Sequence, residues 1–122
     1  MDIDTISAGK ELDGLIAERV FGWKNLVWKE GGHKIDELGN RLSWPMGWYG
    51  DGPRGSTYLV KRYSTNMDDA WEVVEKMREV CCDFSISEGF NAAFLKDDWI
   101  VATADTVPVA ICRAALKTVM EK

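Results

Sequence analysis

The sequence predicts an α+β fold in which an antiparallel sheet is covered by helices, an α/β/α layered sandwich, in a single domain at residues 1–122. Three observations predict it. Apolar residues recur at helical spacing in three segments, they alternate with polar residues in others, and short polar turns join the last alternating segments. Each helical segment has one apolar face, which must be buried on the sheet. The length of 122 residues and the apolar fraction of 46% suit one core.

The first predicted elements are a helix and a short strand. The helix begins near Ser7 and ends at Gly22, which is placed to act as its C-terminal cap. Residues 23–30 (WKNLVWKE) predict a strand that stops at Gly31-Gly32. The apolar positions of the helix are spaced i, i+3, i+4 and i+8 and are Leu12, Leu15, Ile16 and Val20.

Residues 31–56 predict an irregular segment rich in aromatic residues and glycine, because its prolines and glycines forbid a helix and interrupt any strand. A loop of this length in a compact domain is more often functional than idle, unless it contains a strand that the pattern does not reveal. The run of β-forming residues at 57–63 (TYLVKRY) then predicts a strand.

A second helix is predicted to start at Ser64, Thr65 and Asn66, three N-cap candidates in a row. Acidic residues follow in its first turns, where the helix dipole favours negative charge. Its apolar residues form one face and are Met67, Ala70, Trp71, Val74, Met77 and Cys81.

The C-terminal part predicts a three-stranded antiparallel meander and a last helix. Alternating residues place the strands at 81–87, 90–95 and 99–104. In the last helix Asp105 and Thr106 supply the N-terminal cap, and Pro108 lies in the first turn, where its missing N–H costs nothing. Its predicted inner face consists of Ile111, Ala114, Ala115 and Val119.

Charge and hydropathy exclude two classes of partner. The net charge is −5 and the fifteen Lys and Arg are dispersed, so no basic run neutralises the phosphates of a DNA or RNA duplex. A small anionic ligand held by two or three arginines is compatible with this charge, because a local site can be positive on an acidic protein. No apolar run reaches the roughly 18 residues that a membrane span needs, and no signal peptide is recognisable, so we expect a cytoplasmic protein.

The reactive side chains predict neither a metal site, nor a cofactor, nor an enzyme. The single histidine, His33, lies in a predicted loop without a cysteine nearby. The three cysteines include the adjacent pair Cys81-Cys82, and we expect buried, reduced thiols. The paired carboxylates are explained by helix caps and turns. A nucleotide-cleaving enzyme would require Asp97, Asp98 or Asp105 to lie in a pocket.

The aromatic residues of the 31–56 segment predict a ligand site. Trp44, Trp48 and Tyr49 offer flat faces on which a purine stacks, and Arg54 and Arg62 follow closely enough to hold a phosphate. An alternative role for these rings is structural: they would clamp the segment onto the sheet or form a subunit interface.

Further candidates lie in the C-terminal part. Arg113 interrupts the apolar run VPVAICRAAL, so its guanidinium must point outward or meet an anion or a carboxylate such as Asp105. Asn91 lies on a predicted strand, where asparagine is disfavoured, and either an edge position or ligand recognition explains it. The predicted ligand-binding set is Trp44, Trp48, Tyr49, Arg54, Arg62, Asn91, Asp105, Thr106 and Arg113.

Three stretches together resemble one family. They are SAGKELDGLIAERVFGW, YSTNMDDAWEVVEKM and ADTVPVAICRAAL, and they are similar to the motifs of the phage ABA sandwich domain. The resemblance spans nearly the whole chain except residues 31–56, and it implies helices packed on both faces of a sheet. It implies a phage or prophage origin but no catalytic mechanism. The matching motif residues are Asp13, Glu18, Trp23, Ser64, Trp71, Asp105 and Arg113.

A phage origin favours one function among those that the residues permit. Small acidic phage proteins without catalytic residues are similar to anti-defence sponges, which sequester cyclic oligonucleotides or cyclic ADP-ribose isomers in the cytoplasm of the bacterial host. We therefore expect a non-enzymatic, homo-oligomeric protein that binds a small nucleotide-like anion. The alternative is a protein-interaction module that binds a host or phage protein through its aromatic segment.

Overall fold

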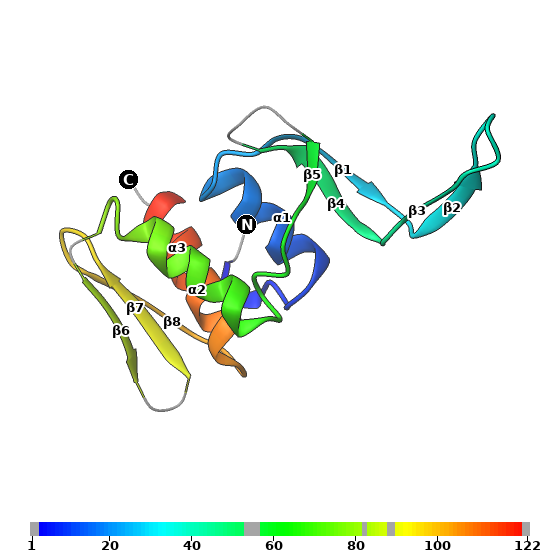
Figure 1. The fold of residues 1–122 in the computed structure, drawn as a ribbon. Coiled ribbons are helices and arrows are strands. Elements are labelled where there is room, and N and C mark those ends of the chain that lie inside the picture. Colours follow the sequence, from blue (N-terminus) through cyan, green and yellow to red (C-terminus); the bar gives the residue numbers. More distant parts are fainter. Residues whose placement is uncertain (1–2, 53–56, 82, 88–89, 121–122) are drawn as a thin grey trace.

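The computed structural model describes residues 3–52, 57–81, 83–87 and 90–120 of the chain. Helices and strands alternate along these residues (Figure 1). In chain order they are η1 (Ile3–Thr5), α1 (Lys10–Arg19), β1 (Lys24–Lys29), β2 (Gly32–Ile35), β3 (Arg41–Trp44), β4 (Gly47–Asp51), β5 (Thr57–Leu59), α2 (Met67–Met77), β6 (Asp83–Ser87), β7 (Asn91–Leu95), β8 (Trp99–Thr103) and α3 (Val107–Met120).

The predicted fold class, α+β with antiparallel strands covered by helices, is confirmed. Every strand pair described is antiparallel. The strands do not form one sheet, however: the described part of the chain has the sheets β1-β4-β5, β2-β3 and β6-β7-β8. Sequence periodicity reports which face of a strand is buried but not which strand it pairs with, so this division was not predicted.

Helix α3 lies at the centre of the molecule and packs against α1, α2, β7 and β8. More of its surface is buried than the single apolar face that the sequence predicts, because helices and a sheet surround it. Cys112 and Leu116 are fully buried as well as the predicted Ile111, Ala114 and Ala115. The predicted inner residue Val119 is instead exposed.

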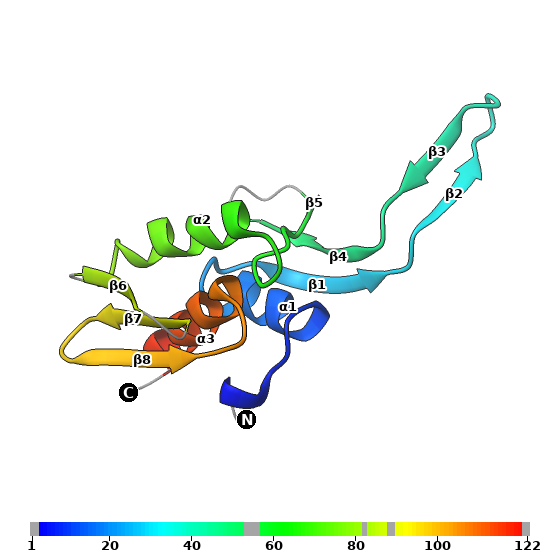
Figure 2. The ribbon, with the colours of Figure 1, turned by 90° about the horizontal axis from the view of Figure 1, so that it is seen from below.

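The prediction of an irregular segment at residues 31–56 is wrong where the structure describes it. Strand β1 leads into β2 and β3 leads back into β4, so that the β2–β3 hairpin projects from the body as an arm (Figures 1 and 2). We call residues 32–44 the arm. At its tip the Asp36 carboxylate accepts hydrogen bonds from the backbone N–H groups of Leu38 (2.9 Å) and Asn40 (2.8 Å). Gly39 completes this turn with a φ of +81°, a conformation that glycine adopts without strain.

The predicted C-terminal cap of α1 and the predicted N-terminal cap of α2 are confirmed. Gly22 has a φ of +76° just beyond α1, and the Trp23 N–H bonds to the Ala17 carbonyl (3.0 Å). The Asn66 side chain caps α2 by accepting a hydrogen bond from the Asp69 N–H at 3.1 Å. The strand predicted at residues 57–63 is shorter than expected and ends at Leu59, because the chain then turns away towards the Asn66 cap.

The predicted meander is confirmed as the sheet β6-β7-β8. Phe94, Ala92 and Ala102 lie on the face that packs against α3 and are buried. Residues at the alternate positions form the opposite face, which we call the outer face, and its Trp99 and Val101 are exposed. The face of this sheet that meets the core is therefore covered, whereas Trp99 and Val101 on the outer face are exposed to solvent.

Candidate functional site

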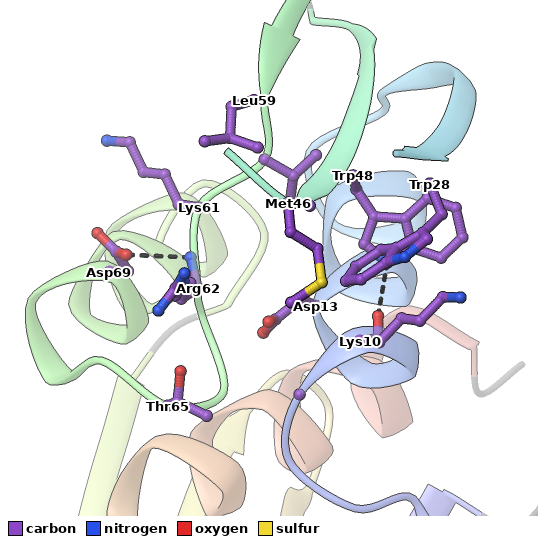
Figure 3. A pocket seen from close by; sticks show the side chains of 13 residues that line it. Lys10, Asp13, Trp28, Met46, Trp48, Leu59, Lys61, Arg62, Thr65 and Asp69 are labelled. Atoms are coloured by element: carbon purple, nitrogen blue, oxygen red, sulfur yellow. Dashed lines mark hydrogen bonds between the residues drawn. The ribbon is translucent and has the colours of Figure 1, made fainter. Parts of the chain in front are cut away.

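A cavity of about 520 Å³ lies between α1, the β1-β4-β5 sheet and the segment that joins β5 to α2 (Figure 3). Its volume is within the range of small-molecule sites, roughly 300–1,000 Å³. Met46 points into it between an indole wall and a polar wall (Figure 3). The lining residues include Lys10, Asp13, Trp28, Met46, Trp48, Lys61, Arg62, Thr65 and Asp69.

Trp28 and Trp48 form the indole wall. They are directly opposite residues of β1 and β4, and their rings meet edge to face with centroids 5.6 Å apart. Trp48 is also fixed to α1, because its Nε1–H donates to the Lys10 carbonyl at 2.6 Å. A Cβ at Gly14 would lie 2.9 Å from the Trp48 ring, so α1 needs glycine there for the indole to pack this closely.

Three cationic side chains lie around the cavity. Lys10 Nζ lies 4.4 Å from the centroid of the Trp28 ring and 5.7 Å from that of Trp48, within cation–π range. Lys61 pairs with Glu72 at 2.6 Å. The Arg62 side chain is exposed at the rim, and none of the ion pairs in the described part of the chain includes it. Lys10 and Arg62 are therefore available to an anion.

The buried carboxylate Asp13 joins the two sequence motifs that flank the cavity. Its Oδ1 accepts hydrogen bonds from the Ser64 backbone N–H and from Ser64 Oγ, both at 2.7 Å. Ser64 Oγ in turn accepts the Gly9 N–H at 2.7 Å. Burial raises the pKa of Asp13 above its usual value, although the bonds from Ser64 and the nearby Arg62 oppose this shift. Asp13 and Ser64 thus hold α1 against the segment before α2.

The predicted aromatic cluster is not formed as a single site. Trp48 and Tyr49 are consecutive in β4 and therefore point to opposite faces of the strand. Tyr49 donates its hydroxyl to the Pro45 carbonyl (2.8 Å), and Lys29 Nζ lies 5.1 Å from its ring. Trp44 lies on the arm and donates Nε1–H to the Glu30 carbonyl at 2.9 Å. Only Trp48 of the three lines the cavity.

The other predicted site residues are dispersed. Arg62 lines the cavity, whereas Arg54 lies outside the described residues. Asn91 is the first residue of β7, which is the central strand of its sheet and not an edge strand. Asp105 and Thr106 are exposed before α3, where the Thr106 carbonyl accepts the Ala110 N–H. Asn91 belongs to the β6-β7-β8 sheet, Asp105 and Thr106 belong to the segment before α3, and none of these three residues lines the cavity.

Arg113 does not point freely outward, and none of the ion pairs among the described residues joins it to a carboxylate such as Asp105. Its Nε and Nη2 donate to the Ile6 carbonyl at 3.2 and 2.8 Å, and Nη1 donates to the Thr103 carbonyl at 3.0 Å. The guanidinium therefore joins α3 to the N-terminal segment and to the end of β8. These carbonyls accept hydrogen bonds from all three guanidinium nitrogens, which allows Arg113 to sit in an apolar helix.

The remaining reactive groups lie apart from the cavity. Among the described residues, no three His, Cys, Asp or Glu side chains gather so as to hold a metal ion. His33 is exposed on β2, not in a loop, and Cys81 and Cys112 are thiols, with burial raising the pKa of Cys112. Asp98 lines a separate hollow of about 630 Å³, together with Ile3, Trp99 and Lys117. No described helix has the length and apolar character needed to cross a bilayer.

Of the residues that line the cavity, sequence reasoning predicted only Trp48 and Arg62 as site residues, and Lys10 and Trp28 are among those that it missed. The sequence pattern could have indicated Trp28. It is two positions from Leu26 on the predicted strand, so the two side chains share one face of β1, and Leu26 packs against the core. Asp13 and Ser64 were noted only as motif residues. Their contact spans 51 positions along the chain, so no local pattern could reveal it.

The fold defines a small α+β domain of antiparallel sheets and helices. Residues 14–116 match the family of the phage ABA sandwich domain, and the chain belongs to this family, as its three motifs indicated. A crystal structure of a phage protein from Bacillus cereus ATCC 14579 is similar in fold, with a TM-score of 0.55, 22% sequence identity and 92% of each chain covered. No curated protein matches the chain.

Proposed function

We propose that this phage protein is a non-enzymatic binding protein that sequesters a small nucleotide-like anion in the cavity between α1, β4 and the segment before α2. One observation carries the proposal: two indoles and the cationic groups of Lys10 and Arg62 surround one cavity of about 520 Å³. An aromatic wall suits a purine base, and the cations suit its phosphates. The phage family supports the further step that the ligand is a cyclic oligonucleotide or cyclic ADP-ribose isomer of host immunity.

Different walls of the cavity would bind different parts of the ligand. The base would lie against Trp28 and Trp48, and the phosphates would lie between Lys10 and Arg62. Met46 is exposed and flexible, so it is able to swing out of the cavity when the ligand enters. Thr65 and Asp69 supply polar groups for ribose hydroxyls.

A thermal-shift screen against cyclic dinucleotides, cyclic trinucleotides and cyclic ADP-ribose isomers tests this function. Ligand at about 100 times its Kd stabilises the folded state by about 2.7 kcal/mol, which gives a rise in Tm of several degrees for a domain of this size. The Arg62→Ala variant should lose this shift but keep the Tm of the unliganded protein, because its side chain is exposed. Arg78→Ala, at the exposed C-terminal cap of α2, is the matched control and should keep the shift.

The ligand recovered after denaturing the complex distinguishes binding from catalysis. A sponge returns the nucleotide intact, whereas an enzyme returns a cleaved product. No shift with any nucleotide, or equal shifts in wild type and Arg62→Ala, would overturn the site proposed here.

The arm favours a second candidate function, interaction with a host or phage protein. Ile35 and Leu38 on the arm are 70% and 86% exposed, which is unusual for side chains of this size and typical of interaction surfaces. An immobilised chain should then retain one stoichiometric protein from a bacterial lysate. The Leu38→Asp variant should lose that protein while retaining the Tm of the wild type.

A further inference from the structure

The outer face of the β6-β7-β8 sheet has an apolar centre and an acidic margin. Trp99 and Val101 of β8 are 44% and 49% exposed on this face. Asp83 of β6 lies on the same face, because it pairs with Leu95 of β7, which in turn pairs with Trp99 of β8. Asp97 and Asp98 form the adjacent turn and are exposed. Three carboxylates and the lysines Lys96 and Lys117 therefore lie around the exposed indole, and Lys117 is paired with Asp4.

The β8 edge of this sheet is protected from an added strand, because side chains of α3 occupy it. Lys117 Nζ donates to the Val101 carbonyl at 3.2 Å, and Arg113 Nη1 donates to the Thr103 carbonyl at 3.0 Å. These bonds take up carbonyls that an added strand would need, a common protection of edge strands.

The arm has a hollow whose chemistry complements this face. It measures about 510 Å³ and is lined by Leu42, Trp44, Lys29, Lys34 and Glu30. Lys34 and Leu42 are register partners on one face of the arm, and Trp44 follows Leu42 by two positions and shares that face. The hollow thus offers an apolar and aromatic surface between two lysines. The Glu30 carboxylate is engaged by Trp28 Nε1–H at 3.2 Å.

We propose that this hollow in one copy of the chain binds Trp99 on the outer face of a second copy. The indole would fill the space between Leu42 and Trp44, and the carboxylates near Trp99 would face Lys29 and Lys34. Apolar burial at the centre and opposite charges at the margin are the usual anatomy of a protein interface. The second copy is favoured as the occupant by this charge complementarity. The cavity proposed for the nucleotide is not involved.

The two surfaces are different parts of the same chain, so the contact is heterologous. Each copy keeps a free arm and a free outer face after one contact forms, and further copies add until a ring closes or a filament grows. The projection of the arm away from the body leaves room for such a contact (Figure 2). Association should weaken as the salt concentration rises, because the charged margin is solvent-exposed.

Analytical ultracentrifugation over a concentration series tests the proposal. The wild type should form species larger than a dimer, and the Leu42→Asp and Trp99→Ala variants should each be monomeric with unchanged circular dichroism. Lys34→Glu or Asp97→Lys alone should weaken association by about tenfold or more, and the double variant should restore it. The control variant Arg62→Ala should assemble as the wild type does while losing nucleotide binding, so the two proposals fail independently.

An equimolar mixture of Leu42→Asp and Trp99→Ala provides the sharpest outcome. Only one productive contact remains, between the arm of the Trp99→Ala copy and the outer face of the Leu42→Asp copy. The mixture should therefore give a one-to-one dimer and nothing larger. A monomeric wild type, assemblies that both variants retain, or an arm that binds only a foreign protein would each overturn the proposal.

Discussion

At the scale of single residues, Asp13 links the stability of the fold to pH. Its carboxylate accepts two hydrogen bonds from Ser64, yet burial raises its pKa above the ordinary value of 3.8. Between the ordinary and the raised pKa, folded Asp13 holds a proton that the unfolded chain has released. The unfolded state then binds fewer protons, so the free energy of unfolding falls as the pH rises through this range.

The Asp13→Asn variant should remove this dependence. Asparagine keeps an acceptor oxygen for Ser64 but does not titrate, so its free energy of unfolding should not fall as the pH rises from 3.8 upward. Urea unfolding of wild type and variant at a series of pH values measures the difference. Asp97→Asn, in an exposed turn, is the control. Equal slopes in wild type and Asp13→Asn would contradict the argument.

Trp48 has a structural role beside any role in binding. The ring packs on Gly14, and its Nε1–H donates to the Lys10 carbonyl. We expect Trp48→Ala to lower the free energy of unfolding by about 2–4 kcal/mol. Trp44→Ala, on the arm, should cost about 1 kcal/mol or less, and calorimetry of both variants separates the two cases.

At the scale of elements, Arg113 connects α3, η1 and β8. The Arg113→Ala variant leaves the Ile6 and Thr103 carbonyls without their donors, which should cost about 1–3 kcal/mol. Amide hydrogen exchange should increase in residues 3–6 and at the end of β8, and much less in α2. Arg78→Ala, which removes an exposed ion pair with Glu75, should change stability by only about 0.5 kcal/mol. If the increase in amide exchange in Arg113→Ala were equal in all elements, it would contradict a local connecting role.

The helices and the meander were predicted well because their signals are local. The Asn66 cap, the Gly22 stop and the alternation in residues 83–103 each act within a few positions of the residue concerned. The arm gave no such signal. Both of its faces meet solvent, so its residues show no alternation of apolar and polar side chains, and only burial imposes that alternation on a strand.

At the scale of the whole molecule, the arm is separable from the core. The cluster of buried core residues contains none from residues 31–46. A variant in which a two-residue Asn-Gly turn replaces residues 32–44 should therefore fold with nearly the Tm of the wild type, since such a turn suits a two-stranded hairpin. It should also lose self-association. A large fall in Tm, measured by calorimetry, would show that the arm supports the core.

The sequence by itself determined the α+β class, the phage family, most helix and strand positions and two of the cavity residues, Trp48 and Arg62. Only the tertiary structure decided that Trp44 and Tyr49 lie elsewhere, that Asp13 bonds to Ser64, and that Arg113 holds Ile6. The physical reason is distance along the chain. Caps and periodicity act over a few residues, whereas the Asp13–Ser64 and Arg113–Ile6 contacts span 51 and 107 positions and exist only once the core has formed.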